Sequence, residues 1–208
     1  MKILITGFGP FGDHLLNPSQ KLVHEIHPST DEKLILDRLI LPVDHVSAPQ
    51  LLLQHLHHFQ PDGVISFGLA AGRAKISLER LAVNLKDFRH ADNQGVKISN
   101  ESVTENGPAA YFSTLPLLCI FDTLKQSNIP VELSLSAGAF LCNQIFYALM
   151  HEIAMHQLPI RAGFIHLPAL PEEAAVSEKP IPSMSIEQLI KAGEIIIRVL
   201  KRTLESNQ

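Results

Sequence analysis

The sequence lacks the features that would direct a chain to nucleic acid, a membrane or the secretory pathway. Its 208 residues hold 17 lysines and arginines against 21 aspartates and glutamates, so the formal net charge is −4 and no basic footprint for nucleic acid is present. The longest apolar stretches fall far short of the ~18 residues of a membrane span. Gly7 and Pro10 interrupt the first apolar run too early for a signal peptide, so we expect a cytoplasmic protein.

Cysteine is also scarce, which limits the metal and disulfide chemistry open to the chain. Cys119 and Cys142 form no CxxC pair, which argues against a structural zinc site, and without a secretory signal a disulfide is not expected. His55, His57 and His58 share a predicted helix but lack the i, i+4 spacing of a helical metal pair, so we expect them to be exposed. We therefore expect no metal and no cofactor.

What the sequence does have is an alternation of strand-like and helix-like runs, with 46% hydrophobic residues to build a full core. Strands joined by crossover helices form a mainly parallel sheet covered on both faces. We predict the α/β class: a three-layer α/β/α sandwich with a mainly parallel or mixed central sheet, in a single domain over residues 1–208. The extended segments expected are residues 2–6, 34–41, 64–67, 76–85, 131–136 and 161–166. We expect a first helix to begin at Asn17-Pro18 and further helices to span residues 46–59, 113–128, 141–157 and 185–206. Residues 92–110 are expected to be irregular.

A glycine-rich loop, residues 7–12, follows the first predicted strand and has the GxGxxG spacing of a dinucleotide site. Pro10 offers no N–H to a phosphate, and the next helix starts only near Pro18, whereas the dinucleotide fingerprint needs a helix N-terminus at the pyrophosphate. The alternative is a tight surface loop. Phe8 and Phe11 lie within it, after a strand, which suggests the wall of an apolar pocket.

Cys142 opens a predicted helix after a strand and a run of small residues, Ser136-Ala137-Gly138-Ala139. A helix N-terminus carries partial positive charge and lowers the pKa of a thiol, which favours a reactive cysteine. The alternative is a small buried hydrophobe, the usual role of a free cysteine. Cys119 lies in an apolar run, residues 117–121, and is expected in the core.

His166 ends an apolar strand, and Glu79 lies at the end of another extended segment. The carboxyl ends of strands form the ligand crevice of open α/β sheets, although each residue alone also fits a plainer role. His166 could be a satisfied edge histidine, and Glu79 could pair with Arg80 or Arg73. Together with Cys142 they supply the thiol, base and orienting carboxylate that a cysteine peptidase requires.

Five segments, in order along nearly the whole chain, resemble the pyroglutamyl-peptidase I family, also called pyrrolidone carboxyl peptidases. They are GFGPFG with NPS, GLAAGRAKISLERLAVN, AYFSTLP, SAGAFLCN and GFIHLPALPE. The resemblance implies an α/β/α homotetramer that removes N-terminal pyroglutamate from peptides through a thioester intermediate. Matching motif to motif, it implies Cys142 as nucleophile, His166 as base and Glu79 as orienter. It also implies Phe8 and Phe11 beside the lactam ring and Arg89 near the catalytic centre.

The sequence departs from the family pattern near the implied site, although no triad member is lost. Leu135 stands where Asn is usual, Phe88 where Ala is usual and Ala169 where Tyr is usual, and His90-Ala91 replaces a common Ile-Pro. These departures bear on the substrate pocket and the catalytic rate. They also leave open an alternative, a weak or inactive relative that binds pyroglutamyl-like or other small ligands.

Overall fold

The structure, a computed structural model, describes residues 1–12, 17–27 and 34–206. A six-stranded sheet lies at its centre, in the order β2-β1-β3-β8-β4-β7. The strands are β1 (Lys2–Phe8), β2 (Ile35–Leu41), β3 (Gly63–Leu69), β4 (Ile76–Glu79), β7 (Val131–Ser134) and β8 (Arg161–Leu167). Strands β2, β1, β3 and β8 are parallel to one another. Strand β4 pairs antiparallel with β8, and β7 runs parallel to β4.

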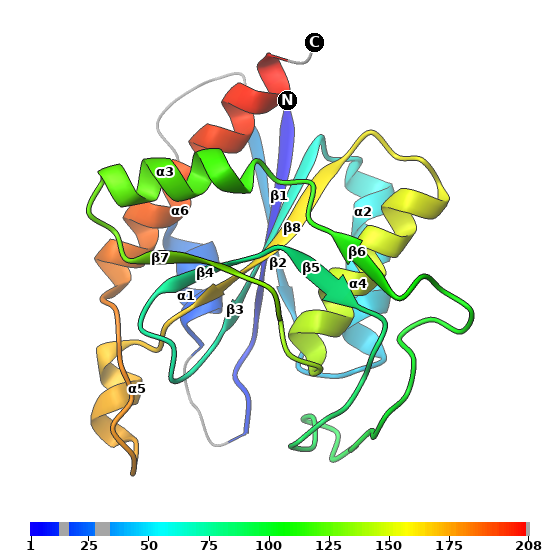
Figure 1. Ribbon diagram of the computed structural model, residues 1–208, viewed down its shortest axis with the longest axis horizontal. Helices are drawn as coiled ribbons and strands as arrows, with labels where there is room; N and C mark the ends of the chain where they lie inside the picture. The colour runs from blue at the N-terminus through cyan, green and yellow to red at the C-terminus, as the bar shows by residue number, and fades with distance from the viewer. Residues whose placement is uncertain (13–16, 28–33, 207–208) are drawn as a thin grey trace.

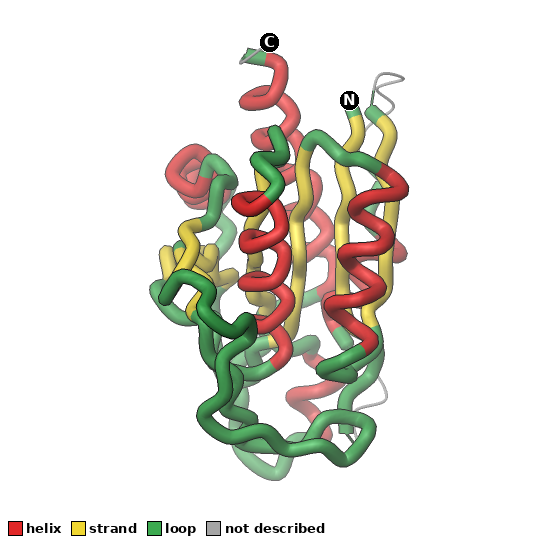
Figure 2. Tube along the Cα trace, turned by 90° about the vertical axis from the view of Figure 1, so that its right-hand side faces the viewer, coloured by secondary structure: helices red, strands yellow, loops and turns green. Residues whose placement is uncertain are grey.

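Helices cover both faces of this sheet, which confirms the predicted three layers and the mixed sheet (Figure 1). One face carries α1 (Pro18–Glu25), α3 (Leu117–Gln126) and α6 (Ile186–Glu205). The other carries α2 (Ser47–Phe59) and α4 (Leu141–Met155), which stand side by side in front of the strands in Figure 2. The two faces thus form two separate cores with the sheet between them.

The ends of several helices follow from their sequences as predicted. Asn17 caps α1, its side chain accepting a hydrogen bond from the backbone N–H of Ser19, and Pro18 occupies the first helical position. Ser185 caps α6 through the backbone N–H of Gln188. Leu22, within α1, is fully buried, as its helical spacing predicts. No helix among the described residues is long and apolar enough to cross a membrane.

One predicted helix is shorter than expected, because its first residues are held by a strand. Thr114 bonds Ala162 in both directions, its N–H donating to the Ala162 carbonyl and its Oγ1 accepting from the Ala162 N–H. The helix predicted over residues 113–128 therefore begins only after Pro116.

Three small elements were not predicted as separate structures. The extended segment 76–85 divides into β4 and β5 (Leu81–Val83), and β5 pairs antiparallel with β6 (Ala110–Phe112) in a second sheet. The helix α5 (Pro171–Val176) is also new. Strands of three residues and a helix of six are too short to show a periodicity in the sequence.

Candidate active site

A buried histidine and a buried glutamate meet where β4 runs antiparallel to β8. Ser77 pairs with His166 and Glu79 with Phe164, so Glu79 and His166 are diagonal neighbours on one face of the sheet. The imidazole Nδ1 lies 2.8 Å from Glu79 Oε1. The Glu79 side chain is fully buried and that of His166 is 5% exposed. With Nδ1 held by the carboxylate, Nε2 is the nitrogen left for proton transfer.

The Cys142 thiol lies over the strand next to this histidine. Gly68 of β3 is the register partner of His166, and adjacent strands are about 4.8 Å apart. A Cβ placed on Gly68 would lie only 3.0 Å from Cys142 Sγ and 2.8 Å from the Phe164 ring. The glycine therefore lets α4 bring the sulfur down onto the sheet, and the structure brings Glu79, His166 and Cys142 together.

The start of α4 leaves backbone N–H groups available beside this thiol. Cys142 is the second residue of the helix, and Phe140 at the cap position offers no side-chain hydrogen bond. Asn143 fixes the neighbouring segment, because its side chain accepts from the Val83 N–H and donates to the carbonyls of Val83 and Leu85. An uncapped helix N-terminus held in this way can stabilise an oxyanion.

Burial sets the protonation states of the thiol and the imidazole. It raises the pKa of Cys142 to about 12, and the charge of Glu79 acts in the same direction. Burial also lowers the pKa of His166, outweighing the opposite effect of its hydrogen bond to Glu79. The backbone N–H at the helix start does act to lower the thiol pKa, but desolvation outweighs it, so the expectation of a lowered pKa is wrong. At neutral pH the pair rests as a neutral thiol and a neutral imidazole.

Arg73 completes the cluster, although the sequence indicates only an ion pair between it and Glu79. Its Nη1 lies 2.6 Å from Glu79 Oε1, the atom that also contacts His166, and its Nη2 donates to the Ser136 carbonyl at 2.9 Å. Burial favours the neutral form of Glu79, but the hydrogen bonds to its carboxylate outweigh this and lower its pKa. The ion pair and the contact with His166 thus coexist. Nothing in the sequence distinguished Arg73 from Arg80, which donates no side-chain bond to Glu79.

An apolar cavity of about 240 Å³ lies beside Cys142, and we call it the lactam cavity after the ring that the family resemblance implies beside Phe8 and Phe11. Both phenylalanines of the glycine-rich loop line it, as predicted, together with Leu69, Leu141 and Phe140. Phe8 is 4% exposed, and the ring of Phe11 lies 5.3 Å from that of Phe140. The cavity offers few polar groups and suits a compact, uncharged ring.

The glycine-rich loop itself is explained by packing between α1 and β1. A Cβ on Gly7 would meet the Ser19 carbonyl oxygen at 2.5 Å, so the glycine allows the helix to approach the strand. Asn17 occupies the helix N-terminus with its own side chain, which also donates to the Gly9 carbonyl. These contacts argue against the dinucleotide site. The surface-loop interpretation is correct only from Gly9 onward, because Gly7 and Phe8 are buried residues of β1. Residues 13–16 lie outside the described residues.

Arg89, which the resemblance implied near the catalytic centre, does not line the lactam cavity. It is exposed and lines a second cavity, of about 670 Å³, whose lining does not include Cys142. His90 lines the same cavity, whereas Phe88 between Asp87 and Arg89 is buried against Phe140 with ring centroids 4.7 Å apart. Of the other departures, Ala169 is fully buried and Leu135 is 63% exposed.

Two predictions about single side chains are wrong. Cys119 is exposed rather than in the core, because the buried face of α3 is formed by Ile120 and Leu124. His55 is half-buried rather than exposed, because its Nε2 contacts Asp37 of β2 at 2.7 Å. In both cases an apolar run or a helical spacing did not determine which side of the helix faced the sheet.

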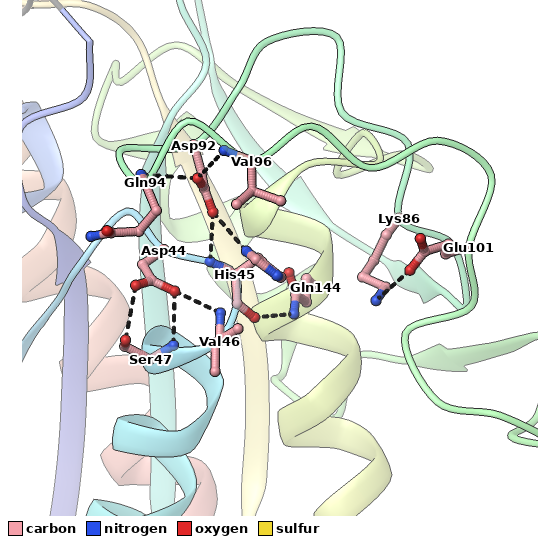
Figure 3. A network of polar contacts seen from close by, with 10 residues as sticks. All are labelled: Asp44, His45, Val46, Ser47, Lys86, Asp92, Gln94, Val96, Glu101 and Gln144. Carbon is pink, nitrogen blue, oxygen red and sulfur yellow. Dashed lines mark hydrogen bonds and ion pairs between the residues drawn. The ribbon is translucent and has the colours of Figure 1, made fainter.

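One group of described side chains has the separation of metal ligands: Asp44, His45 and Asp92, with ligand atoms within 4.8 Å of one another. Protein N–H groups already engage these carboxylates, as Figure 3 shows. His45 Nδ1 lies 2.7 Å from Asp92 Oδ2, and the His45 carbonyl accepts from Gln144 Nε2. The group is therefore a hydrogen-bonded network that anchors the first turn of α4, two residues beyond Cys142.

Comparisons with known proteins agree on one family. A sequence profile described as pyroglutamyl peptidase matches residues 1–203. The pyrrolidone-carboxylate peptidase of Vibrio vulnificus is 42% identical over 202 residues, which cover 97% of this chain and 93% of that protein. A mutant pyrrolidone carboxyl peptidase from Pyrococcus furiosus superposes with a TM-score of 0.93 at 38% identity, covering 98% of this chain and 100% of the other. Pyroglutamyl peptidase I of Bacillus amyloliquefaciens gives 0.90 at 37% identity, covering 96% of each chain.

Proposed function

The chain belongs to the pyroglutamyl peptidase family, and from that premise we propose that Cys142, His166 and Glu79 carry out its reaction, the removal of N-terminal pyroglutamate from peptides. The observation that carries this assignment is the contact between His166 Nδ1 and Glu79 Oε1, next to a thiol held over Gly68. The enzyme is a cysteine peptidase, and the lactam cavity beside the sulfur has the size and apolar lining for a pyroglutamyl ring.

The first half of the proposed mechanism acylates the enzyme. His166 takes the thiol proton on Nε2 as Cys142 Sγ attacks the carbonyl carbon that joins pyroglutamate to the next residue. The carbonyl electrons move onto oxygen, and the free N–H groups of the first turn of α4 stabilise the resulting oxyanion. When the intermediate collapses, the C–N bond breaks, and the leaving amine takes the proton from His166. Pyroglutamate remains bound to sulfur as a thioester.

The second half restores the thiol. His166, neutral again, removes a proton from water as the water attacks the thioester, and the departing thiolate takes that proton back. Glu79 holds the imidazole and stabilises its charged form in both halves. Arg73 acts as a positioning residue, since its guanidinium shares Glu79 Oε1 and ties it to the segment before α4 through the Ser136 carbonyl.

Thiol substitution tests this proposal. Hydrolysis of a pyroglutamyl anilide should be lost in Cys142→Ser and retained in Cys119→Ser. Because Cys119 is exposed, an alkylating reagent labels it too, so inactivation by alkylation should be measured in the Cys119→Ser enzyme. Full activity in Cys142→Ser would refute the assignment. Binding without hydrolysis by the wild-type protein would favour an inactive relative.

We also propose that residues 1–208 form one domain, that the protein is cytoplasmic and that it assembles as a homotetramer. A single sheet covered on both faces supports one domain. Two free cysteines suit a reducing compartment, and cell fractionation would test it. Phe112 and Leu118, 69% and 68% exposed, line one groove, and such apolar exposure favours contact with further copies. Sedimentation equilibrium would give the number of chains.

A further inference from the structure

The second cavity adjoins the lactam cavity and offers space for the part of a peptide that follows the ring. The two share Phe11, Leu69, Ala71 and Phe140 as common walls. Of the two cavities, the lactam cavity is the one that Cys142 lines, so a substrate whose ring fills it would place its scissile carbonyl beside the thiol. The leaving residue then enters the second cavity. We call it the leaving-group cavity.

The segment that carries its charged residues is fixed to the start of α4. Backbone bonds join Asp87 to the Ala139 carbonyl and Phe88 to the Ile98 carbonyl, at 2.9 and 2.7 Å. Phe88 turns inward, with 2% of its surface exposed and its ring against Phe140. Its two neighbours, Asp87 and Arg89, are exposed and both line the leaving-group cavity. Their position relative to Cys142 is therefore set by the backbone.

The charged side chains that line this cavity differ in whether they have a hydrogen-bond partner. The Asp87 carboxylate accepts a hydrogen bond from Ser99 Oγ at 3.2 Å. Among the described residues, the Arg89 guanidinium has neither a hydrogen bond nor an ion pair, and His90 beside it has none either. An exposed guanidinium that lines a cavity next to the lactam cavity, with no partner among the residues that the structure describes, is suited to bind a carboxylate through paired N–H donors.

On the basis of the proposed function, we propose that the leaving-group cavity binds a substrate carboxylate through Arg89, with His90 as a second donor. Two parts of a substrate can supply it. One is the terminal carboxylate of a pyroglutamyl dipeptide, which lies within about 3.8 Å, one residue length, of the scissile bond. The other is the side chain of an acidic second residue in a longer peptide. The site thus determines which peptides are cleaved best.

Four peptides separate these two sources. Pyroglutamyl-alanine is compared with its amide, which removes the terminal carboxylate. Pyroglutamyl-glutamate amide is compared with pyroglutamyl-glutamine amide, which removes the side-chain carboxylate. In each pair we expect the ratio of kcat/KM, acid over neutral, to be about tenfold for the carboxylate that Arg89 binds, the effect of one charge-assisted hydrogen bond of ordinary strength.

The same ratios are then measured in Arg89→Gln and in Lys97→Gln. Lys97 is exposed on the same loop and does not line the cavity, so its variant removes an equal charge from nearby. Arg89→Gln should bring the ratio close to one, while Lys97→Gln should keep the wild-type value. Because each ratio is taken within one enzyme, a partial loss of folded protein cancels.

Each outcome decides the proposal. A ratio that falls only in Arg89→Gln supports it and identifies the source of the carboxylate by the pair in which it falls. Ratios near one in the wild type, or a preference that survives in Arg89→Gln, overturn the carboxylate site while leaving the peptidase function intact. Failure of the wild-type protein to cleave any of the four peptides refutes the peptidase function and the site with it.

Discussion

The two faces of the central sheet are built from different kinds of residue. On the face covered by α1, α3 and α6, the buried strand residues among those described are apolar or glycine, for example Ile65, Leu78 and Ile165. Strand alternation places every buried polar strand residue on the face covered by α2 and α4. These residues are Thr6, Ser66, Ser77, Glu79 and His166.

The difference shows where the fold gives up stability for chemistry. Buried polar atoms without hydrogen bonds cost free energy. Among the described strand residues, the buried side-chain atoms Thr6 Oγ1, Ser66 Oγ and Glu79 Oε2 have no hydrogen bond, and all three belong to the face covered by α2 and α4. The aliphatic packing of the other face offsets this cost. Because side chains alternate along a strand, β8 contributes Ile165 to the aliphatic core on one face and His166 to the polar cluster on the other.

The largest effect that separates the faces is expected at Glu79. Glu79→Gln should lower kcat on the order of 10⁴-fold, the loss seen when a triad loses its orienting carboxylate. The amide can no longer stabilise the imidazolium, and it can present an N–H where His166 Nδ1 needs an acceptor. The measurement is turnover of a pyroglutamyl anilide, with circular dichroism to verify folding.

Glu132→Gln is the matched control for this variant. Glu132 lies on β7, one strand away, and accepts from Ser77 Oγ without contacting His166. It should keep near wild-type turnover. If a folded Glu79→Gln enzyme retains more than about a tenth of that turnover, Glu79 is not the orienter.

The opposite face is tested at Ile165, the neighbour of His166 in β8. Ile165→Ala should cost about 2–5 kcal/mol of unfolding free energy, because it leaves a cavity in the aliphatic core. Its kcat/KM should stay close to wild type under native conditions, since its side chain points away from the thiol. Urea denaturation and steady-state kinetics on the same preparation give both values. A large loss of activity with unchanged stability would show that the faces are not separate.

The sequence could predict the architecture because hydrophobic runs and caps mark the strands and long helices. It could not predict which side of a short helix faces the sheet, and so it misplaced Cys119 in α3. The resemblance supplied the three proposed catalytic residues; His166 contacts Glu79, and the Cys142 thiol lies over Gly68, the register partner of His166. Their protonation states depend on desolvation, which spacing cannot reveal, and so the expected low thiol pKa was wrong. The role of Arg73 depends on one oxygen that it shares with His166, a contact visible only in three dimensions.

The smallest effect within the polar face is expected at Arg73, and it appears most clearly as a shift with pH. The positive charge of Arg73 lowers the pKa of His166, whereas the Glu79 hydrogen bond and charge raise it. His166 must be neutral to take the thiol proton, so activity falls as the pH drops through that pKa. Arg73→Gln should move the acid limb of kcat/KM to higher pH, and Glu79→Gln should move it to lower pH.

The rate loss in Arg73→Gln should be only about tenfold, because the guanidinium is 31% exposed and partly screened. Arg73→Lys keeps a charge but loses the paired contact with Ser136, so it should hold the limb in place, and Arg80→Gln should leave both limb and rate unchanged. An acid limb that does not move in Arg73→Gln would mean that Arg73 only packs beside Glu79.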